Sequence, residues 1–341
     1  MQERSVISEG GEVIVPSSGE TAEDISRASV VGKAGVILGG DLNIVKPNDT
    51  LDSAFLAITI SNGNQQKELS KRAQGKSVVH ISNSDLKDVI MQIPTLTEQA
   101  SISNFFRTLD TTITLHKRKL DRLKELKKGY LQQMFPQNGE RVPRVRFSGF
   151  VGDWQERKLG EVANFRRGSF PQPYGLPEWY DEKNGMPFVQ VVDVGNNLRL
   201  IDDTKQKISK LAQPKSVYVP EGRVVVTLQG SIGRVAITQY PSYIDRTLLI
   251  FEDYMTEIDA YYWAYVIQQK FDIEKQTAPG GTIKTITKEV LSDFEVSLPC
   301  ISEQAAIGNL FRNLDEQITA QSQKLEQLKK LKTAYLQKMF I

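Results

Sequence analysis

The sequence has very few of the residues that build metal and redox sites. Its 341 residues include one cysteine, Cys300, and two histidines, His80 and His116. A single thiol allows no disulfide framework, which fits a reducing compartment. One cysteine and two histidines also cannot supply the spacing of a structural zinc site. We therefore expect no metal site.

Long apolar runs and a strong net charge are also missing. No run approaches the ~18 apolar residues of a membrane-spanning helix, and residues 1–13 are polar where a signal peptide needs an apolar core. With 43 basic and 41 acidic residues the formal net charge is only +2, which argues against a strongly acidic chain such as a protein mimic of DNA. We expect a cytoplasmic protein with no membrane partner.

Motifs of catalysis and of nucleotide binding are absent as well. The sequence contains neither the glycine fingerprint of dinucleotide-binding folds nor the phosphate loop of NTPases. We expect no catalytic residue, and no cofactor bound by this chain.

An internal repeat organises what is present. Residues 94–135 align with residues 299–340 without a gap, at an offset of 205, and 23 of these 42 positions are identical. Further upstream, the sequence Gly-Glu-Val-Ile-Val at 11–15 matches Gly-Arg-Val-Val-Val at 222–226, at an offset of 211. A duplicated supersecondary unit is the usual origin of such self-similarity. The order is therefore domain, long segment, domain, long segment.

Each long segment is predicted to be a helix that begins near Thr97 or Ser302, whose hydroxyl could cap it, with Glu98 or Glu303 in the first turn. Apolar residues at spacings of mostly three and four predict a coiled-coil seam, with polar slots at His116 and Gln321. The seam residues are Leu109, Ile113, Leu120, Leu123, Tyr130, Leu314, Ile318, Leu325, Leu328 and Tyr335. The two helices are the obvious partners for each other, in antiparallel orientation. Such a pair could simply support the fold, or it could act as a ruler, since a straight helix of this length spans on the order of 55 Å.

The second domain contains short β-like runs at 188–192, 217–219, 223–227, 234–238 and 247–251, followed by a helix from 257 to about 275. The aromatic cluster at 261–265 in that helix is expected to be core. Polar, basic and glycine-rich loops between the strands are candidate DNA contacts, because arginine and glutamine can bind base edges while lysine holds phosphates. These candidates are Arg166, Arg167, Ser169, Lys205, Lys207, Lys210, Gln229, Ser231, Arg234, Thr282 and Lys284.

These motifs together resemble the specificity subunit of type I restriction–modification enzymes. The resemblance is carried by Pro-x-x-[Ser/Thr]-Glu-Gln at 94–99 and 299–304, and by Tyr-Leu-Gln-x-Met-Phe at 130–135 and 335–340. Phe-x-Gly-Phe at 147–150, Trp154 and Lys-Leu-Gly-Glu at 158–161 match the family's entry into a target-recognition domain. The resemblance covers nearly the whole chain.

The resemblance implies a mixed α+β fold with two α/β target-recognition domains, separated by two long helices that form an antiparallel coiled coil. The expected boundaries are a first recognition domain at 1–93, a helix at 94–135, a linker at 136–146, a second recognition domain at 147–298 and a helix at 299–341. Each recognition domain would read one half of a bipartite sequence in double-stranded DNA.

The family also implies partners. The long helices would recruit two modification subunits that methylate adenine with S-adenosylmethionine, and restriction subunits could join and cleave DNA with ATP and magnesium. The first copy departs from the pattern, because residues 143–211 have no counterpart ahead of Met1 at the offset of 211. DNA reading by the first domain is therefore an open question. The alternative function is an assembly scaffold that does not read DNA, self-associates or competes with full-length subunits.

Overall fold

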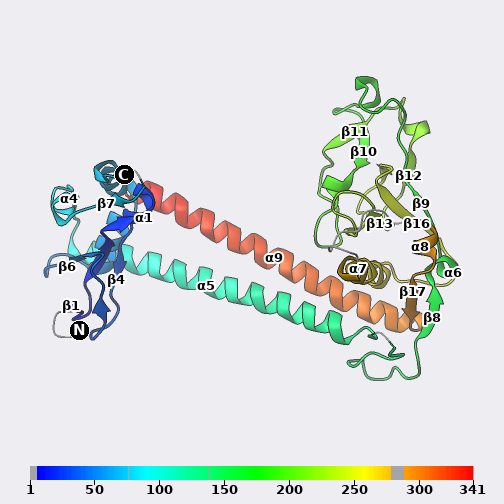
Figure 1. Cartoon of the computed structure of the whole chain (residues 1–341), viewed down its shortest axis with the longest axis horizontal. Coiled ribbons are helices and arrows are strands. Elements are labelled where there is room, and N and C mark those ends of the chain that lie inside the picture. The colour runs from blue at the N-terminus through cyan, green and yellow to red at the C-terminus, as the bar shows by residue number, and fades with distance from the viewer. Residues whose placement is uncertain (1–5, 76, 138, 278–287, 341) are drawn as a thin grey trace. The chain divides into compact units, whose positions relative to one another are not determined.

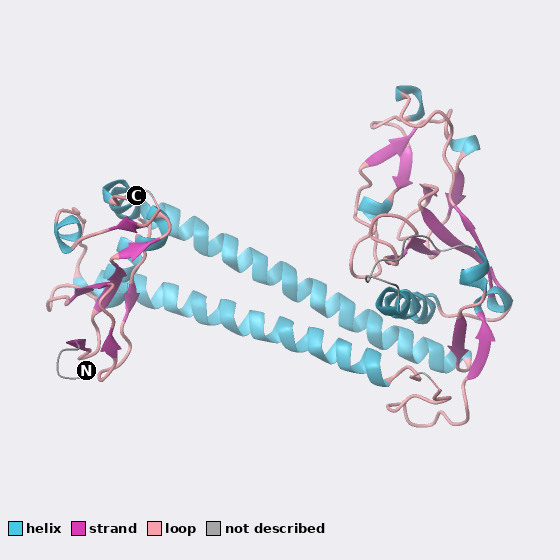
Figure 2. Ribbon diagram, in the orientation of Figure 1, coloured by secondary structure: helices cyan, strands magenta, loops and turns pink. Residues whose placement is uncertain are grey.

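A computed structural model describes residues 6–75, 77–137, 139–277 and 288–340 (Figures 1 and 2). The chain divides into two compact units. Unit 1 comprises residues 1–120 together with 321–341, and unit 2 comprises residues 121–320. No helix among the described residues is long and apolar enough to cross a membrane.

Two helices are far longer than the rest: α5 (Leu96–Gln133) and α9 (Ile301–Met339). Each helix begins one residue before its predicted start, at Leu96 and Ile301. Thr97 lies inside α5, and the hydroxyl that accepts from the first turn is that of Thr95, which receives the Glu98 N–H at 3.4 Å. Cys300 holds the position equivalent to Thr95, and its carbonyl accepts from the Glu303 N–H at 3.0 Å. The hydroxyl of Ser302 is therefore not the cap of α9, because the helix already includes it.

The long helices run antiparallel, because partners on α9 move backward along the chain as those on α5 move forward. In unit 1, the ring of Phe105 lies 5.0 Å from that of Tyr335, Asp110 forms an ion pair with Lys332, and Gln321 Nε2 lies 2.6 Å from His116 Nδ1. In unit 2, Lys127 Nζ lies 2.6 Å from Asp315 Oδ1. The pairs Asp110–Lys332 and Asp315–Lys127 occupy the same two repeat positions with the helices exchanged. The duplication thus produces a symmetric register.

Unit 1 contains a small antiparallel sheet in the order β4-β2-β6, formed by Ser29–Val30, Val13–Pro16 and Leu42–Val45. Its other elements are β1 (Val6–Ile7) paired with β5 (Ile37–Leu38), β3 (Ser18–Gly19) paired with β7 (Val79–His80), and the helices α1 (Ala22–Ile25), α2 (Ser53–Ile60), α3 (Gly63–Arg72) and α4 (Asn83–Lys87). The core lies between this sheet and α2 and includes Val13, Val15 and Leu56. Phe55 of α2 packs with Phe106 of α5 and with Phe340, which follows the end of α9.

Unit 2 is built on two four-stranded sheets. The first has the order β14-β13-β16-β9 and the second has the order β11-β10-β15-β12. Their strands are β9 (Ala163–Arg167), β10 (Met186–Val189), β11 (Gln206–Ile208), β12 (Val217–Val219), β13 (Val224–Thr227), β14 (Val235–Ile237), β15 (Ser242–Ile244) and β16 (Leu248–Tyr254). The strand pair β8 (Gln155–Lys158) and β17 (Glu295–Leu298), the helices α6 (Leu159–Val162), α7 (Ala260–Thr277) and α8 (Lys288–Ser292), and the 3-10 helices η2 (Pro177–Trp179), η3 (Val191–Asp193) and η4 (Gln213–Lys215) complete it.

The core of unit 2 lies where α7 packs on the first sheet and on the beginning of α9 (Figure 1). Tyr262, Trp263 and Tyr265 are fully buried, which confirms the expected core role of these aromatic residues. The predicted strand at 188–192 was too long. It ends at Val189, and η3 follows because the Asp193 carboxylate accepts from the Gln190 N–H at 2.8 Å.

Candidate nucleic-acid interface

The short connection from β15 to β16 brings the two sheets of unit 2 together. The Asp245 N–H donates to the Val189 carbonyl at 3.0 Å, and the Ser169 N–H donates to the Ile244 carbonyl at 3.0 Å. On the other side, the Leu228 N–H donates to the Thr247 carbonyl at 2.8 Å. The ends of β9, β10 and β13 therefore meet at residues 245–247. We call this region, with the side chains of Arg167, Ser169, Tyr174, Gln190, Lys215, Gln229, Ser231 and Arg246, the sheet junction.

Two glycines permit this close approach. A Cβ atom at Gly168 would lie 2.2 Å from the Ile244 carbonyl oxygen, so no other residue fits without moving the backbone. Gly230, in the turn after β13, has a φ of +63°, which glycine adopts without strain. The glycine-rich character of these loops thus serves the meeting of the strands.

Basic side chains surround the junction and are exposed to solvent. They are Arg167, Lys215 and Arg246. Lys215 Nζ lies 4.6 Å from the centroid of the Trp179 ring, and the Arg246 guanidinium lies 5.6 Å from that of Tyr174. Contacts of this kind hold a cation in place while leaving its N–H groups able to donate. The cations of Lys215 and Arg246 are therefore held against aromatic rings.

A hydrogen-bonded network lies beneath Arg246. The Gln190 amide donates to the Tyr174 hydroxyl at 2.7 Å, and that hydroxyl donates to the Asp245 carboxylate at 3.3 Å. Asp245 is buried, and its other carboxylate oxygen accepts from the Thr247 N–H at 2.9 Å. Burial, together with the charge of Asp245, raises the pKa of Tyr174 to about 12, so the phenol stays protonated at neutral pH. The network fixes the ring against which Arg246 packs.

The structure brings four of the predicted contact residues to this junction and separates the others. Arg167, Ser169, Gln229 and Ser231 belong to it. Arg166 lies on the opposite face of β9, as alternation in a strand requires, and its guanidinium is 3.8 Å from the Glu252 carboxylate.

Four other predicted residues lie away from the junction: Arg234 lies just before β14, and Lys205, Lys207 and Lys210 lie in and around β11. Arg234 Nη1 donates to the Val194 carbonyl at 3.4 Å, and the Lys205 N–H donates to the Asp193 carboxylate at 2.8 Å. Lys207 is paired with Asp203 at 3.1 Å, whereas Lys210 is exposed. Thr282 and Lys284 lie outside the described residues.

Reasoning from the sequence missed Tyr174, Gln190, Lys215 and Arg246. None of them stands in a basic or glycine-rich run, and they meet through contacts between segments that are far apart in the sequence. The one available signal was Asp-Arg-Thr at 245–247. An aspartate followed two residues later by a threonine is typical of a side chain that caps its own turn, which leaves the middle arginine exposed.

The predicted seam residues of the helices fall into two groups. Leu109, Leu120, Leu314, Ile318 and Leu325 are buried, and Ile113, Leu123, Tyr130 and Leu328 are half-buried. Tyr335 is exposed, with its ring edge against Phe105. The polar slots pair with each other, since Gln321 Nε2 also donates to the His116 carbonyl at 2.9 Å.

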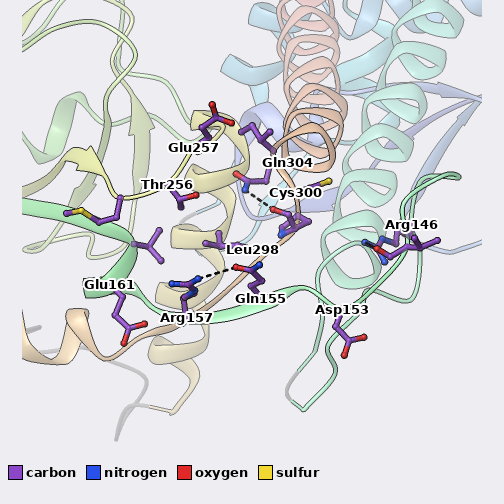
Figure 3. Close-up of a pocket in the computed structure, with 15 residues that line it drawn as sticks. Arg146, Asp153, Gln155, Arg157, Glu161, Thr256, Glu257, Leu298, Cys300 and Gln304 are labelled. Atoms are coloured by element: carbon purple, nitrogen blue, oxygen red, sulfur yellow. Dashed lines mark hydrogen bonds between the residues drawn. The ribbon is translucent and has the colours of Figure 1, made fainter.

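A pocket of about 600 Å³ opens where β8 and β17 meet the beginning of α9 (Figure 3). Its lining balances Arg146 and Arg157 against Asp153, Glu161 and Glu257. Figure 3 shows Arg157 turned toward Gln155, to whose side-chain oxygen it donates at 3.4 Å. Because the charges compensate, this pocket offers no positive field for a phosphate backbone.

Two ionisable groups that line this pocket, Arg146 and Cys300, have shifted pKa values. Arg146 makes a two-pronged ion pair with Glu303, at 2.7 Å for each contact, and this pair raises the pKa of Arg146. Hydrogen bonds from Ser302 and from the Glu303 N–H lower the pKa of the exposed Cys300 thiol. Among the described residues, no group of three or more histidine, cysteine, aspartate or glutamate side chains could hold a metal ion.

The chain is similar in sequence to proteins of a known family. The family model "Type I restriction modification DNA specificity domain" matches residues 7–125 and 152–330. The type I restriction enzyme MjaVIII specificity subunit of Methanocaldococcus jannaschii is 19% identical over 345 residues, which are 96% of this chain and 78% of that protein.

Two solved structures share the fold. The type I restriction–modification S subunit of M. genitalium superposes with a TM-score of 0.64 at 16% identity, over 99% of this chain and 85% of that one. The HsdS subunit of Thermoanaerobacter tengcongensis gives a TM-score of 0.52 at 19% identity, over 97% and 80%. Because the family model matches well over half of the chain, the protein belongs to the type I restriction–modification DNA specificity family.

Proposed function

We propose that the sheet junction of unit 2 is the surface through which this specificity subunit reads DNA. The observation that carries the proposal is the gathering of Arg167, Lys215 and Arg246 around one strand connection, with Gln229 and Ser231 beside them. Arginine and glutamine recognise base edges by paired hydrogen bonds, and lysine binds phosphates. The fixed ring beneath Arg246 reduces the entropy that would be lost when that side chain binds.

We further propose that the chain acts without chemistry of its own, within a complex. The antiparallel helix pairs offer long surfaces for two modification subunits, which would carry S-adenosylmethionine, and restriction subunits with ATP and magnesium could join them. The seam residues pair the two helices, and we propose that this same stretch of the helices also contributes to partner binding. The family membership favours this reading subunit over a scaffold that does not bind DNA.

DNA binding by the complex with its modification subunit tests the proposal. On the target sequence, Arg246→Ala and Arg167→Ala should each weaken binding, because a lost base contact costs ~1–3 kcal/mol. Lys215→Ala should weaken binding to all sequences alike. It should also reduce the slope of log K against log salt concentration by about one, because one phosphate contact is lost. Lys183→Ala, an exposed lysine outside the junction, is the matched control. If the three junction variants bind target and random DNA as the wild type and the Lys183→Ala control do, the junction is not the reading surface.

A further inference from the structure

The small sheet of unit 1 is a shorter version of the first sheet of unit 2. Val13 on β2 pairs with Val30 on β4, as Val224 on β13 pairs with Ile237 on β14. Ile14 pairs with Ile44 on β6 in the same way that Val225 pairs with Ile250 on β16. The strands β4, β2 and β6 therefore correspond to β14, β13 and β16.

Both edges of this sheet are covered in unit 2. The strand β9 (Ala163–Arg167) pairs along β16. On the other edge, the Ile237 N–H donates to the Leu198 carbonyl at 2.9 Å, and Arg199 forms a parallel bridge with Ile237. In unit 1 the corresponding edges are β6 and β4, and among the described residues they are the last strands of the sheet. The chain segment 163–199 of unit 2 thus covers two edges that stay open in unit 1.

A groove of about 690 Å³ lies beside the open edge of β4, between α2 and α5. It is lined by residues of β4, α2, α5 and α9. The lining includes Val30, Ala54, Ile58, Thr114 and Leu115, together with the charged side chains of Arg107, Asp110, Arg118 and Lys332. The exposed fractions of Val30 and Leu115 are 37% and 57%, which is high for apolar side chains in one groove. An open strand edge next to apolar surface is a template for an added strand.

The same place is filled in unit 2. The helices α2 and α7 correspond, because the Asp52 N–H donates to Gln99 Oε1 at 2.8 Å and the Asp259 N–H donates to Gln304 Oε1 at 3.2 Å. By this register Tyr261 and Tyr265 hold the positions of Ala54 and Ile58.

The segment around residues 197–199, which covers the edge of β14, fills the rest of this space in unit 2. Asn197 donates to the Thr319 hydroxyl at 3.0 Å, and Thr319 is the repeat equivalent of Thr114. Leu198, beside it, is buried with an exposed fraction of 1%. In unit 2 the residues around 197–199 therefore occupy the space that corresponds to the groove of unit 1.

We propose that the open face of unit 1, which comprises the free edges of β4 and β6 and the groove, binds a polypeptide segment equivalent to residues 163–199. The segment is supplied by a partner chain of a different kind, because in a second copy of this chain residues 163–199 are already held in unit 2. One part of that segment adds a strand to β6, and another part adds to β4 and fills the groove. The inference does not depend on DNA reading by unit 2, since it concerns only the completion of a sheet. With the segment bound, unit 1 would contain residues equivalent to Arg167 and Ser169. It would then have a second sheet junction.

The test uses the full chain co-expressed with a tagged polypeptide of residues 143–211 as the probe. We expect the probe to co-purify in equal amount and to slow amide hydrogen exchange of residues 28–31 and 42–45 about tenfold. Thr114→Trp, which places a bulky ring in the groove, should abolish both effects. Thr108→Trp, exposed on the same helix but outside the groove lining, should leave both unchanged.

Three results would overturn the proposal. The first is unchanged exchange at both strands, with the probe added or fused ahead of Met1, where its effective concentration is high. The second is protection with the fused segment alone, which assigns the face to a segment of the same chain. The third is a dimer of the full chain that protects these strands without the probe, which makes a second copy the occupant. No DNA is present, so none of these outcomes bears on the reading surface of unit 2.

Discussion

The duplicated ion pair offers an internal comparison of one interaction in two environments. Lys127 and Asp315 have side-chain exposed fractions of 17% and 9%, whereas their equivalents Lys332 and Asp110 have 31% and 52%. Asp315 also accepts a hydrogen bond from the Tyr265 hydroxyl, and Lys127 Nζ lies 5.0 Å from the centroid of that ring. Lys127→Met leaves a buried carboxylate with a single donor. The free energy of unfolding should therefore fall by about 3 kcal/mol.

The equivalent change in unit 1 should cost much less. Lys332→Met removes an ion pair that water screens, so the loss should stay below about 1 kcal/mol. The three tryptophans of the chain, Trp154, Trp179 and Trp263, all lie in unit 2, so their fluorescence during urea unfolding reports on Lys127. Hydrogen exchange of residues 105–115 reports on Lys332.

Lys128→Met, an exposed neighbour of Lys127, is the control for the loss of one positive charge. Equal losses for Lys127→Met and Lys332→Met would refute the argument from burial. A loss for Lys128→Met as large as that for Lys127→Met would refute the argument from the specific pair.

Three further changes follow from the same contacts. Arg146→Ala leaves Glu303, whose side chain is 1% exposed, without its cation; urea unfolding should show a loss of about 3 kcal/mol, and an unchanged midpoint would contradict this. Gly308→Ala places a Cβ 2.2 Å from Asp259 Oδ1; it should lower the free energy of unfolding by ~1–3 kcal/mol, and a variant as stable as the wild type would show that α7 can shift at no cost. Burial raises the pKa of Asp193 above its usual 3.8, so the folded state holds this proton more tightly than the unfolded state. Its contribution to stability is therefore present below pH 4 and is lost as the pH rises. Relative to Asp193→Asn, the wild type should lose stability as the pH rises from about 4 through the raised pKa of Asp193, and parallel pH profiles would contradict the assignment.

The long helices were predictable because repeat identity and apolar spacing are local properties of the sequence. Their starts were not, since Thr95 and Thr97 can both cap a helix and only the backbone path decides which hydroxyl meets the free N–H. The expected cap at Ser302 failed for the same reason. The antiparallel orientation was expected from the family resemblance, and pairs such as Asp110 with Lys332 confirm it.

The candidate site was only half predictable. Arg167 and Gln229 stand in loops whose composition marks them, but Arg246 and Lys215 become neighbours of these loops only through the pairing of β9, β13, β15 and β16. Single charged residues between strands carry no local signal of such long-range contacts.

The open face of unit 1 could not be predicted from the sequence, because the repeat offset changes along the chain. The repeat offset is 205 along the long helices, 207 at α2 and α7, and 211 at β2 and β13. The offset changes because loops in the two copies differ in length. An ungapped alignment of the two copies therefore does not align Ala54 with Tyr261. Only matched hydrogen bonds, such as those of Asp52 and Asp259, restore the correspondence.

Sequencing of methylated DNA from cells that express this chain with its modification subunit tests the central claim most directly. The account predicts a methylated motif with two separated halves, one of which relaxes or is lost when Gln229 and Arg246 are changed to alanine. Recovery of the unchanged motif from that double variant would contradict the account, as would methylation with no sequence preference in the wild type.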